Sequence, residues 1–191
     1  MLLNVHDLAG DKVLASSVRG KRLLADLIAK LQPVRAPEVL GLDFGGVEVA
    51  TGSFLRESVL AFRDYCRRDQ ALLYPVVANA AAEVTEELEC VLRDRAEALV
   101  VCRWESRQGF SEPQVIGVLE EKQRATLEAV VKAGCVDAGA LLRQFGKKEG
   151  IGITGWNNRL AALAAKGILM ESKQGRGKQY KPVLEGLVYG S

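Results

Sequence analysis

The stretch ITGWNNRLAALAAKGILMESKQGRGKQYKPV, residues 153–183, decides the fold expected for the C-terminal part of the chain. Its first half spaces apolar side chains as a helix does and stops at Gly167, and Thr154 is the expected cap. Two short strands, ILMES (168–172) and KQYKP (178–182), follow around the turn KQGRGK. The sequence therefore predicts a helix and then a hairpin whose turn is rich in cations.

The N-terminal end of the predicted helix carries side chains suited to a nucleic acid. An asparagine can bind adenine through two hydrogen bonds, and an arginine can bind guanine in the same way. The candidate contacts are Thr154, Trp156, Asn157, Asn158 and Arg159. For Trp156 a second interpretation is open, since a tryptophan at this place can also anchor the core between helices.

The hairpin supplies the positive charge. Lys173, Arg176 and Lys178 surround two glycines, which let the backbone approach a ligand closely while the cations neutralise phosphates. The order of the elements and the placement of charge favour DNA binding. The alternative is a solvated cationic hairpin on a small helical domain that binds protein.

Two more helices are expected before this element, over residues 119–134 and 136–148, the second with Asp137 as its N-cap. Through NRLAALAAKGIL and GRGKQY, residues 119–185 resemble the recognition helix and wing of bacterial winged helix-turn-helix regulators. The resemblance places the three hairpin cations at the DNA backbone or minor groove. It implies a major-groove position for Thr154, Asn157, Asn158 and Arg159.

The N-terminal part alternates strands and helices. Apolar runs bounded by turn residues indicate buried strands, and the amphipathic segments between them indicate helices. Residues 105–113 are interpreted as a turn or linker, and 114–119 either close the sheet or lead into the next domain. This order predicts an α/β layered domain with some parallel pairing. The expected strands are 1–10, 12–16, 39–44, 72–79 and 98–104, and the expected helices are 17–31, 52–68 and 80–97.

The segment LGLDFGGVEVATGSFLRESVLAFRDY, residues 40–65, with SSVRGKRLLADLI upstream, resembles the STAS-like domain family, relatives of the anti-sigma-factor antagonists. In the antagonists, a partner kinase phosphorylates a serine at the helix start, and Ser53 matches it here. Thr51 stands where the family usually has an acid, and Phe54 where it has a glycine. Ser53 therefore has two interpretations, a regulatory phosphorylation site or an N-cap.

Asp43 also has two interpretations. An Asp at a strand end of an α/β sheet lies where ligands often bind, or it satisfies the backbone of the Gly45–Gly46 turn. No second carboxylate, histidine or lysine stands at a spacing that suggests catalysis, and the glycine pair is too short for a phosphate loop. We expect no enzyme activity and no cofactor.

Composition narrows the class of protein further. The 191 residues carry a net charge of +2, with −3 over residues 1–118 (14 Lys+Arg, 17 Asp+Glu) and +5 over 119–191 (12 against 7). The four cysteines form no CxxC pair and His6 is the only histidine, so reduced thiols and no metal site are expected. Neither a signal peptide nor a membrane span is recognisable, which predicts a cytoplasmic protein.

The sequence as a whole predicts an α/β STAS-like layered domain, residues 1–113, followed by a small α+β winged helix domain, residues 114–191. The expected function is a DNA-binding transcriptional regulator, in which the first domain senses a signal or dimerises. A homodimer would pair through the apolar helices 54–66 or 119–133. The alternative is a protein-interaction module of anti-sigma-antagonist type that partners a regulatory kinase or ATPase.

Overall fold

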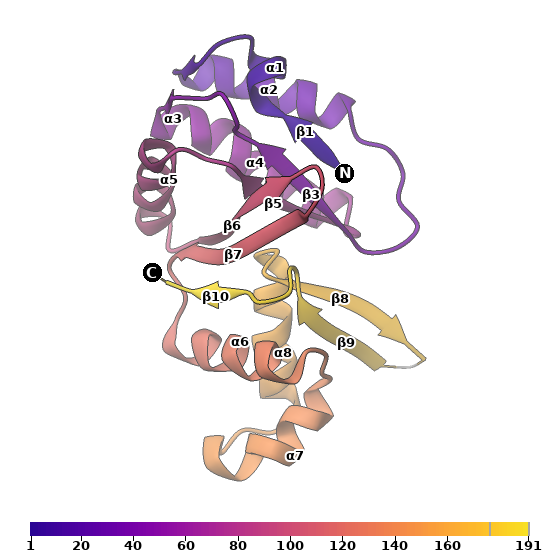
Figure 1. The fold of residues 1–191 in the computed structure, drawn as a ribbon. Helices are drawn as coiled ribbons and strands as arrows, with labels where there is room; N and C mark the ends of the chain where they lie inside the picture. The colour runs from indigo at the N-terminus through magenta and orange to yellow at the C-terminus, as the bar shows by residue number, and fades with distance from the viewer. Residues whose placement is uncertain (176, 191) are drawn as a thin grey trace.

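The computed structural model describes residues 1–175 and 177–190, without the side chains of Lys147 and Lys148. Figure 1 shows an N-terminal part built on a sheet and its helices, and a C-terminal part of three helices and a hairpin packed against that sheet. The fold is mixed α/β with a mostly parallel central sheet, so the predicted layered α/β class is confirmed at that level.

The central sheet has six strands in the order β1-β3-β5-β6-β7-β10. The first four strands in this order are parallel, β7 runs antiparallel to β6, and β10 is parallel to β7. The strands are β1 (Leu2–Asn4), β3 (Glu38–Asp43), β5 (Leu73–Ala78), β6 (Ala98–Glu105), β7 (Gly109–Gly117) and β10 (Val188–Tyr189).

Helices lie beside this sheet in the N-terminal part (Figure 1). They are α1 (Val5–Ala9), α2 (Ser17–Ala29), α3 (Gly52–Leu55), the π-helical turn η1 (Arg56–Leu60), α4 (Ala61–Asp69) and α5 (Ala82–Asp94). A two-stranded parallel ribbon joins β2 (Val13–Leu14) to β4 (Val49–Ala50). Because α3, η1 and α4 follow one another without a break, residues 52–69 form one helix with a π turn inside it.

The C-terminal part follows the expected order of elements. Its helices are α6 (Glu121–Ala133), α7 (Ala138–Glu149) and α8 (Ile153–Ala165), and its hairpin pairs β8 (Leu169–Gln174) with β9 (Gly177–Pro182) in antiparallel register. Asp137 is the N-cap of α7, as predicted, since its Oδ1 accepts a hydrogen bond from the Ala140 N–H at 2.7 Å.

The two parts share a core. Successive side chains of a strand point to opposite faces of a sheet. On β5, Leu73 and Val77 therefore belong to the apolar cluster under the N-terminal helices, whereas Tyr74 and Val76 belong to a cluster that includes Leu127, on α6. The C-terminal part thus covers the sheet face that the N-terminal helices leave open, which satisfies the need of a parallel sheet for cover on both faces.

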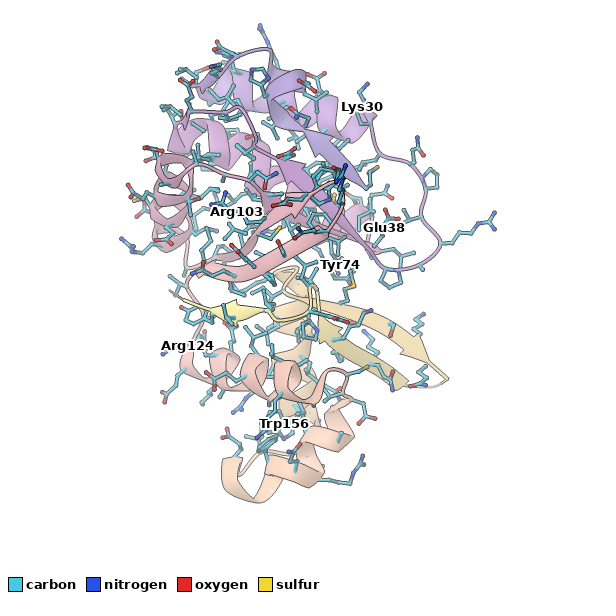
Figure 2. The ribbon with its side chains drawn as sticks, in the orientation of Figure 1. Lys30, Glu38, Tyr74, Arg103, Arg124 and Trp156 are labelled. Carbon is cyan, nitrogen blue, oxygen red and sulfur yellow. The ribbon has the colours of Figure 1, made fainter. Side chains whose placement is uncertain are left out.

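Polar contacts reinforce the junction between the two parts. The Arg67 Nε, on α4, donates to the carbonyl oxygen of Ala164 at 3.1 Å. Lys166 donates to a Glu97 carboxylate oxygen at 3.1 Å, and the backbone N–H of Glu171 donates to the Tyr74 hydroxyl at 2.8 Å. Figure 2 shows Tyr74 between the sheet and the C-terminal part. The C-terminal end of α8 and the start of the hairpin are therefore bound directly to the N-terminal part.

The last strand ties the chain end back to the sheet. In β10, Val188 and Tyr189 pair with Gln114 and Val115 of β7. The Tyr189 hydroxyl donates to the Gly117 carbonyl oxygen at 3.1 Å and accepts from the Leu119 N–H at 3.4 Å. The sequence did not predict this strand, because a two-residue pairing across 74 positions (Val188 with Gln114) leaves no local pattern.

The interpretation of residues 105–113 as a turn or linker is confirmed only for residues 106–108, and is wrong for the rest of the range. Only a short turn separates β6 from β7, and β7 runs through residue 113, so the predicted domain boundary falls inside a strand. Polar side chains at Ser111 and Glu112 suggested a loop, but they stand on β7 where Ser111 is half-buried and Glu112 is exposed, so a strand tolerates them. Gly109 has φ +77°, a conformation that favours glycine, and it begins the strand.

Residues 1–10 were predicted as a strand, but they form β1 and then α1. The Asn4 side chain caps α1 by accepting a hydrogen bond from the Asp7 N–H at 2.8 Å, and Gly10 ends it with φ +68°. The cap and the glycine are ordinary helix boundaries. The helix is only five residues long, too short to show a helical period in the sequence.

Candidate nucleic-acid interface

A groove of about 620 Å³ lies between α8, the start of α7 and the β8–β9 hairpin. From α8 it is lined by Ile153, Asn157, Asn158 and Ala161. The hairpin contributes Gln174, Gly177, Lys178, Gln179 and Tyr180 to the other side. The structure therefore brings the predicted helix and the predicted hairpin together on one concave surface.

Helix α8 has one buried and one exposed face. Its buried side chains, Trp156, Leu160 and Leu163, recur at the spacing of a helix face. The exposed face starts with the polar residues Thr154, Asn157 and Asn158 and continues with the small residues Ala161 and Ala165. This exposed face has amides at its start and methyl groups beyond them. Because no long side chain projects from it, the helix could lie close to the base edges in a groove of DNA.

Thr154 is exposed on α8, but it does not cap the helix. The N-cap is Gly152, and Thr154 is the second helical residue. The helix starts earlier than the sequence indicated. Ile153 belongs to its first turn, although the Ile153 side chain is 50% exposed. Thr154 stays available on the surface as a hydroxyl donor.

Trp156 lies in the core. Its side chain is 2% exposed and its ring centre is 6.2 Å from that of Phe145, so it packs between α8 and α7. Figure 2 places it among the helices of the C-terminal part. Within the described residues its indole N–H has no hydrogen-bond partner. The second interpretation of Trp156, as a core anchor, therefore fits the structure, and a DNA contact by this side chain does not.

Arg159 is held inside the helical part. Its Nη1 lies 2.9 Å from Glu149 Oε2, its guanidinium carbon is 5.0 Å from the centre of the Trp156 ring, and its side chain is 12% exposed. The ion pair links α8 to α7, and the cation–π contact lies within α8, where it holds the guanidinium against the Trp156 ring. The expectation that Arg159 faces a DNA groove is therefore corrected: this side chain is mostly buried and joins α8 to α7 through its ion pair with Glu149. The helical period alone left open which side of α8 meets α7.

The hairpin cations differ in their surroundings. Lys173 is exposed, and Lys178 lines the groove with its Nζ 2.8 Å from Glu171 Oε1. Arg176 lies outside the described residues. Lys178 is 52% exposed, so its ion pair with Glu171 is of the weak, solvent-screened kind. A phosphate can compete for this ammonium group.

Tyr180 holds the base of the hairpin. It is 2% exposed, its hydroxyl donates to Glu171 at 3.2 Å, and its backbone pairs with Val136 just before α7. Burial, with the Glu171 carboxylate beside it, raises the pKa of the Tyr180 hydroxyl to about 12. The hairpin is therefore fixed to the helices at its base.

The groove also contains residues that sequence reasoning missed. Gln174 and Gln179 face it from the hairpin, and Asp137 and Gly139 line its end at the start of α7. These amides carry no charge, so the cationic pattern of the hairpin did not indicate them. Alternation along the strands was the available signal, since it places every second side chain of a hairpin on one face.

Ser53 lies in the first turn of α3 and is not its N-cap. The cap residue is Thr51, whose Oγ1 is 3.2 Å from Ser53 Oγ, and the Gly52 N–H donates to Glu87 Oε1 at 2.6 Å. A carboxylate from α5 therefore already occupies the position at the helix start where the helix dipole would stabilise a phosphate most. Phosphorylation of Ser53 stays a prediction, and it would bring a phosphate next to Glu87.

Asp43 satisfies the turn that follows β3. Its Oδ1 accepts hydrogen bonds from the Gly45 N–H at 2.9 Å and from the Asn79 amide at 3.0 Å, and its side chain is buried. Asn79 also bonds both the N–H and the carbonyl oxygen of Trp104. Of the two interpretations of Asp43, the structural one agrees with these contacts.

The thiols and acids of the described residues form no metal-binding group of three or more His, Cys, Asp and Glu side chains. Cys66 and Cys102 are buried, and burial raises the pKa of each thiol to about 12. Cys90 and Cys135 are exposed. Over the same part of the chain, no helix has both the length and the apolar character that crossing a bilayer requires.

The two helices considered for a homodimer interface use their apolar side chains inside the chain. Phe54, Leu55, Val59 and Phe62 are at most 1% exposed, and Leu127 and Val130 of α6 are at most 2% exposed. These faces are therefore not free to pair two copies.

Comparisons with known proteins give no relative that could assign a role to this groove. A scan against models of protein families found no match, and searches of curated proteins and of solved structures found no similar protein. The interpretation of the groove therefore depends on its geometry and chemistry.

Proposed function

We propose that the chain is a DNA-binding transcriptional regulator, in which α6–α8 and the β8–β9 hairpin act as a winged helix and the N-terminal part acts as a STAS-like sensing or dimerisation domain. The observation that carries the proposal is the groove in which the exposed amides of Asn157 and Asn158 face the same space as Lys178. Amides suit base edges and the cation suits a phosphate.

Charge supports the same assignment. The C-terminal 73 residues carry +5 while the rest of the chain carries −3, so a polyanion is drawn toward the C-terminal part. The end of α8 that bears the amides is the one next to α7, away from the central sheet (Figure 1). A duplex can therefore approach that end without meeting the N-terminal part.

The proposed contact surface is smaller than the sequence indicated. It consists of Thr154, Asn157 and Asn158 on α8 with Lys173 and Lys178 on the hairpin, and Arg176 remains a predicted contact. Trp156 and Arg159 lie beneath this surface. Trp156 fills the core under α8, and Arg159 joins α8 to α7.

The test is a mobility-shift titration of the full chain with a pool of random duplexes. We expect the N157A/N158A double variant to lose most of the specific binding. Gln108→Ala is the matched control, because it removes an exposed amide from the β6–β7 turn. Equal binding by the double variant and the control would refute this role for the amides.

Salt dependence tests the role of the hairpin. Lys178→Ala should weaken binding to all duplexes alike and reduce the slope of log K against log salt by about 0.9, the value for one phosphate contact. Lys30→Ala is the control, since Lys30 projects from the end of α2 on the opposite side of the molecule (Figure 2). If the full chain binds no duplex and instead retains a regulatory kinase, the protein-interaction alternative replaces DNA binding.

A further inference from the structure

We infer that the groove reads A·T base pairs, with adenine bound by Asn157 or Asn158, and does not read guanine from α8. This inference rests on the proposed DNA binding and specifies the bases it selects. Three observations support it: the confinement of Arg159, the exposure of the two amides, and the methyl group of Ala161 one turn further along α8.

Arg159 is the only charged residue in the α8 sequence ITGWNNRLAALAA. Arginine is the side chain that most often binds guanine, through the O6 and N7 acceptors. Here the guanidinium is paired with Glu149 at 2.9 Å, stacked over Trp156 and 12% exposed. Reaching a base would break both contacts and leave the Glu149 carboxylate without its partner, so α8 presents no cation to a guanine.

The amides of α8 are in the opposite situation. Asn157 and Asn158 are exposed and line the groove. Among the hydrogen bonds within the described residues, neither side chain takes part. An asparagine amide donates to N7 of adenine and accepts from its N6 amino group, so the pair of atoms it offers matches adenine. Both amides can therefore bind a base without first giving up an internal partner.

Ala161 extends the match to the paired base. It lies one turn beyond the two asparagines, is exposed, and lines the same groove. A small apolar side chain in the major groove contacts the C5 methyl group of thymine, which guanine–cytosine pairs lack. On the hairpin side the groove cation, Lys178, is 2.8 Å from Glu171 and is better placed for a phosphate at the rim than for a base edge.

The experiment is selection of bound duplexes from a random pool with the full chain, followed by atom-specific substitution. We expect adenine at one or two fixed positions of each selected half-site. Replacing that adenine by 7-deazaadenine, which lacks the N7 acceptor, should weaken binding roughly 5-fold or more. The Asn157→Ala or Asn158→Ala variant that removes the amide in contact should bind the two duplexes equally. Gln108→Ala should keep the full difference.

Two results separate the possible failures. Selection of guanine at the fixed positions, or equal binding of the adenine and 7-deazaadenine duplexes by the unaltered chain, overturns the base assignment while DNA binding stands. Failure to retain any duplex at low salt overturns the proposed function, and the base assignment falls with it.

Discussion

Replacing Tyr74 by Phe tests whether the two parts of the chain fold as one unit. Tyr74 lies on β5, is 1% exposed, and accepts the Glu171 N–H at the start of the hairpin at 2.8 Å. The Arg67 guanidinium lies over its ring at 4.0 Å. Phenylalanine keeps the ring, the packing and most of the cation–π contact. The change therefore removes one acceptor and leaves a part-buried N–H unpaired.

The expected cost follows from that unpaired donor. A buried donor left without an acceptor lowers the free energy of unfolding by about 1–3 kcal/mol. With a urea m-value of about 2 kcal/mol/M, the unfolding midpoint should fall by about 0.5–1.5 M. Tyr65→Phe is the control, because its hydroxyl makes no hydrogen bond within the part of the chain that the structure describes, and its midpoint should stay unchanged.

The two tryptophans make the assay specific to each part. Trp104 lies on β6 and Trp156 on α8, so single-tryptophan variants follow a strand of the central sheet and a C-terminal helix by fluorescence. Because the apolar cluster crosses the junction, we expect both probes to show one transition, shifted equally by Tyr74→Phe. Separate transitions, or a shift of the Trp156 signal alone, would refute the single folding unit.

Three further predictions concern the side chains already placed. Arg159→Ala should lower the free energy of unfolding by about 1–2 kcal/mol, because the Glu149 ion pair and the cation–π contact are lost. The base preference in selected duplexes should stay the same, and a changed preference would show that Arg159 reaches DNA. Ser53→Glu should be less stable than Ser53→Gln by about 0.5 kcal/mol, since a second carboxylate then faces Glu87, and the difference should shrink in high salt; equal thermal midpoints would contradict this arrangement. A thiol reagent at pH 8 should modify the two exposed cysteines of the native chain quickly and the two buried ones only after unfolding, as counted by absorbance. Because burial raises the folded-state pKa of both buried thiols from 9.0 to about 12, their contribution to stability is complete below pH 9 and is lost as pH rises toward 12.

Local patterns in the sequence predicted much of the fold. The strand at 39–44 corresponds to β3, the capping aspartate at Asp137 starts α7, and the glycines around residue 176 mark the turn between β8 and β9. Each of these depends on residues close together in the chain. Period, cap and turn signals are therefore enough to recover them.

Contacts between distant residues could not be predicted in this way. The partner of Arg159 is Glu149, on a neighbouring helix whose angle the sequence does not specify, and β10 pairs across 74 positions (Val188 with Gln114) with β7. From the sequence alone, both polar and apolar side chains of α8 were candidates for DNA contact. The packing of α8 against α7 determines which of them are buried. The sequence thus predicted which segment forms the candidate site. Only the tertiary structure distinguishes the exposed residues of that segment from the buried ones.

The return of the chain to the sheet at β10 has a mechanical consequence. The chain leaves the sheet at the end of β7 and comes back beside the same strand. The segment α6–α8 with the hairpin is therefore an insertion between two adjacent strands, not a separate domain joined by a single linker. Tension applied at the carboxyl terminus would first detach a two-residue strand and its Tyr189 brace. After that release the shared apolar cluster and the contacts of Arg67, Tyr74 and Lys166 would still hold the insertion to the sheet, so β10 is the first of several restraints to yield.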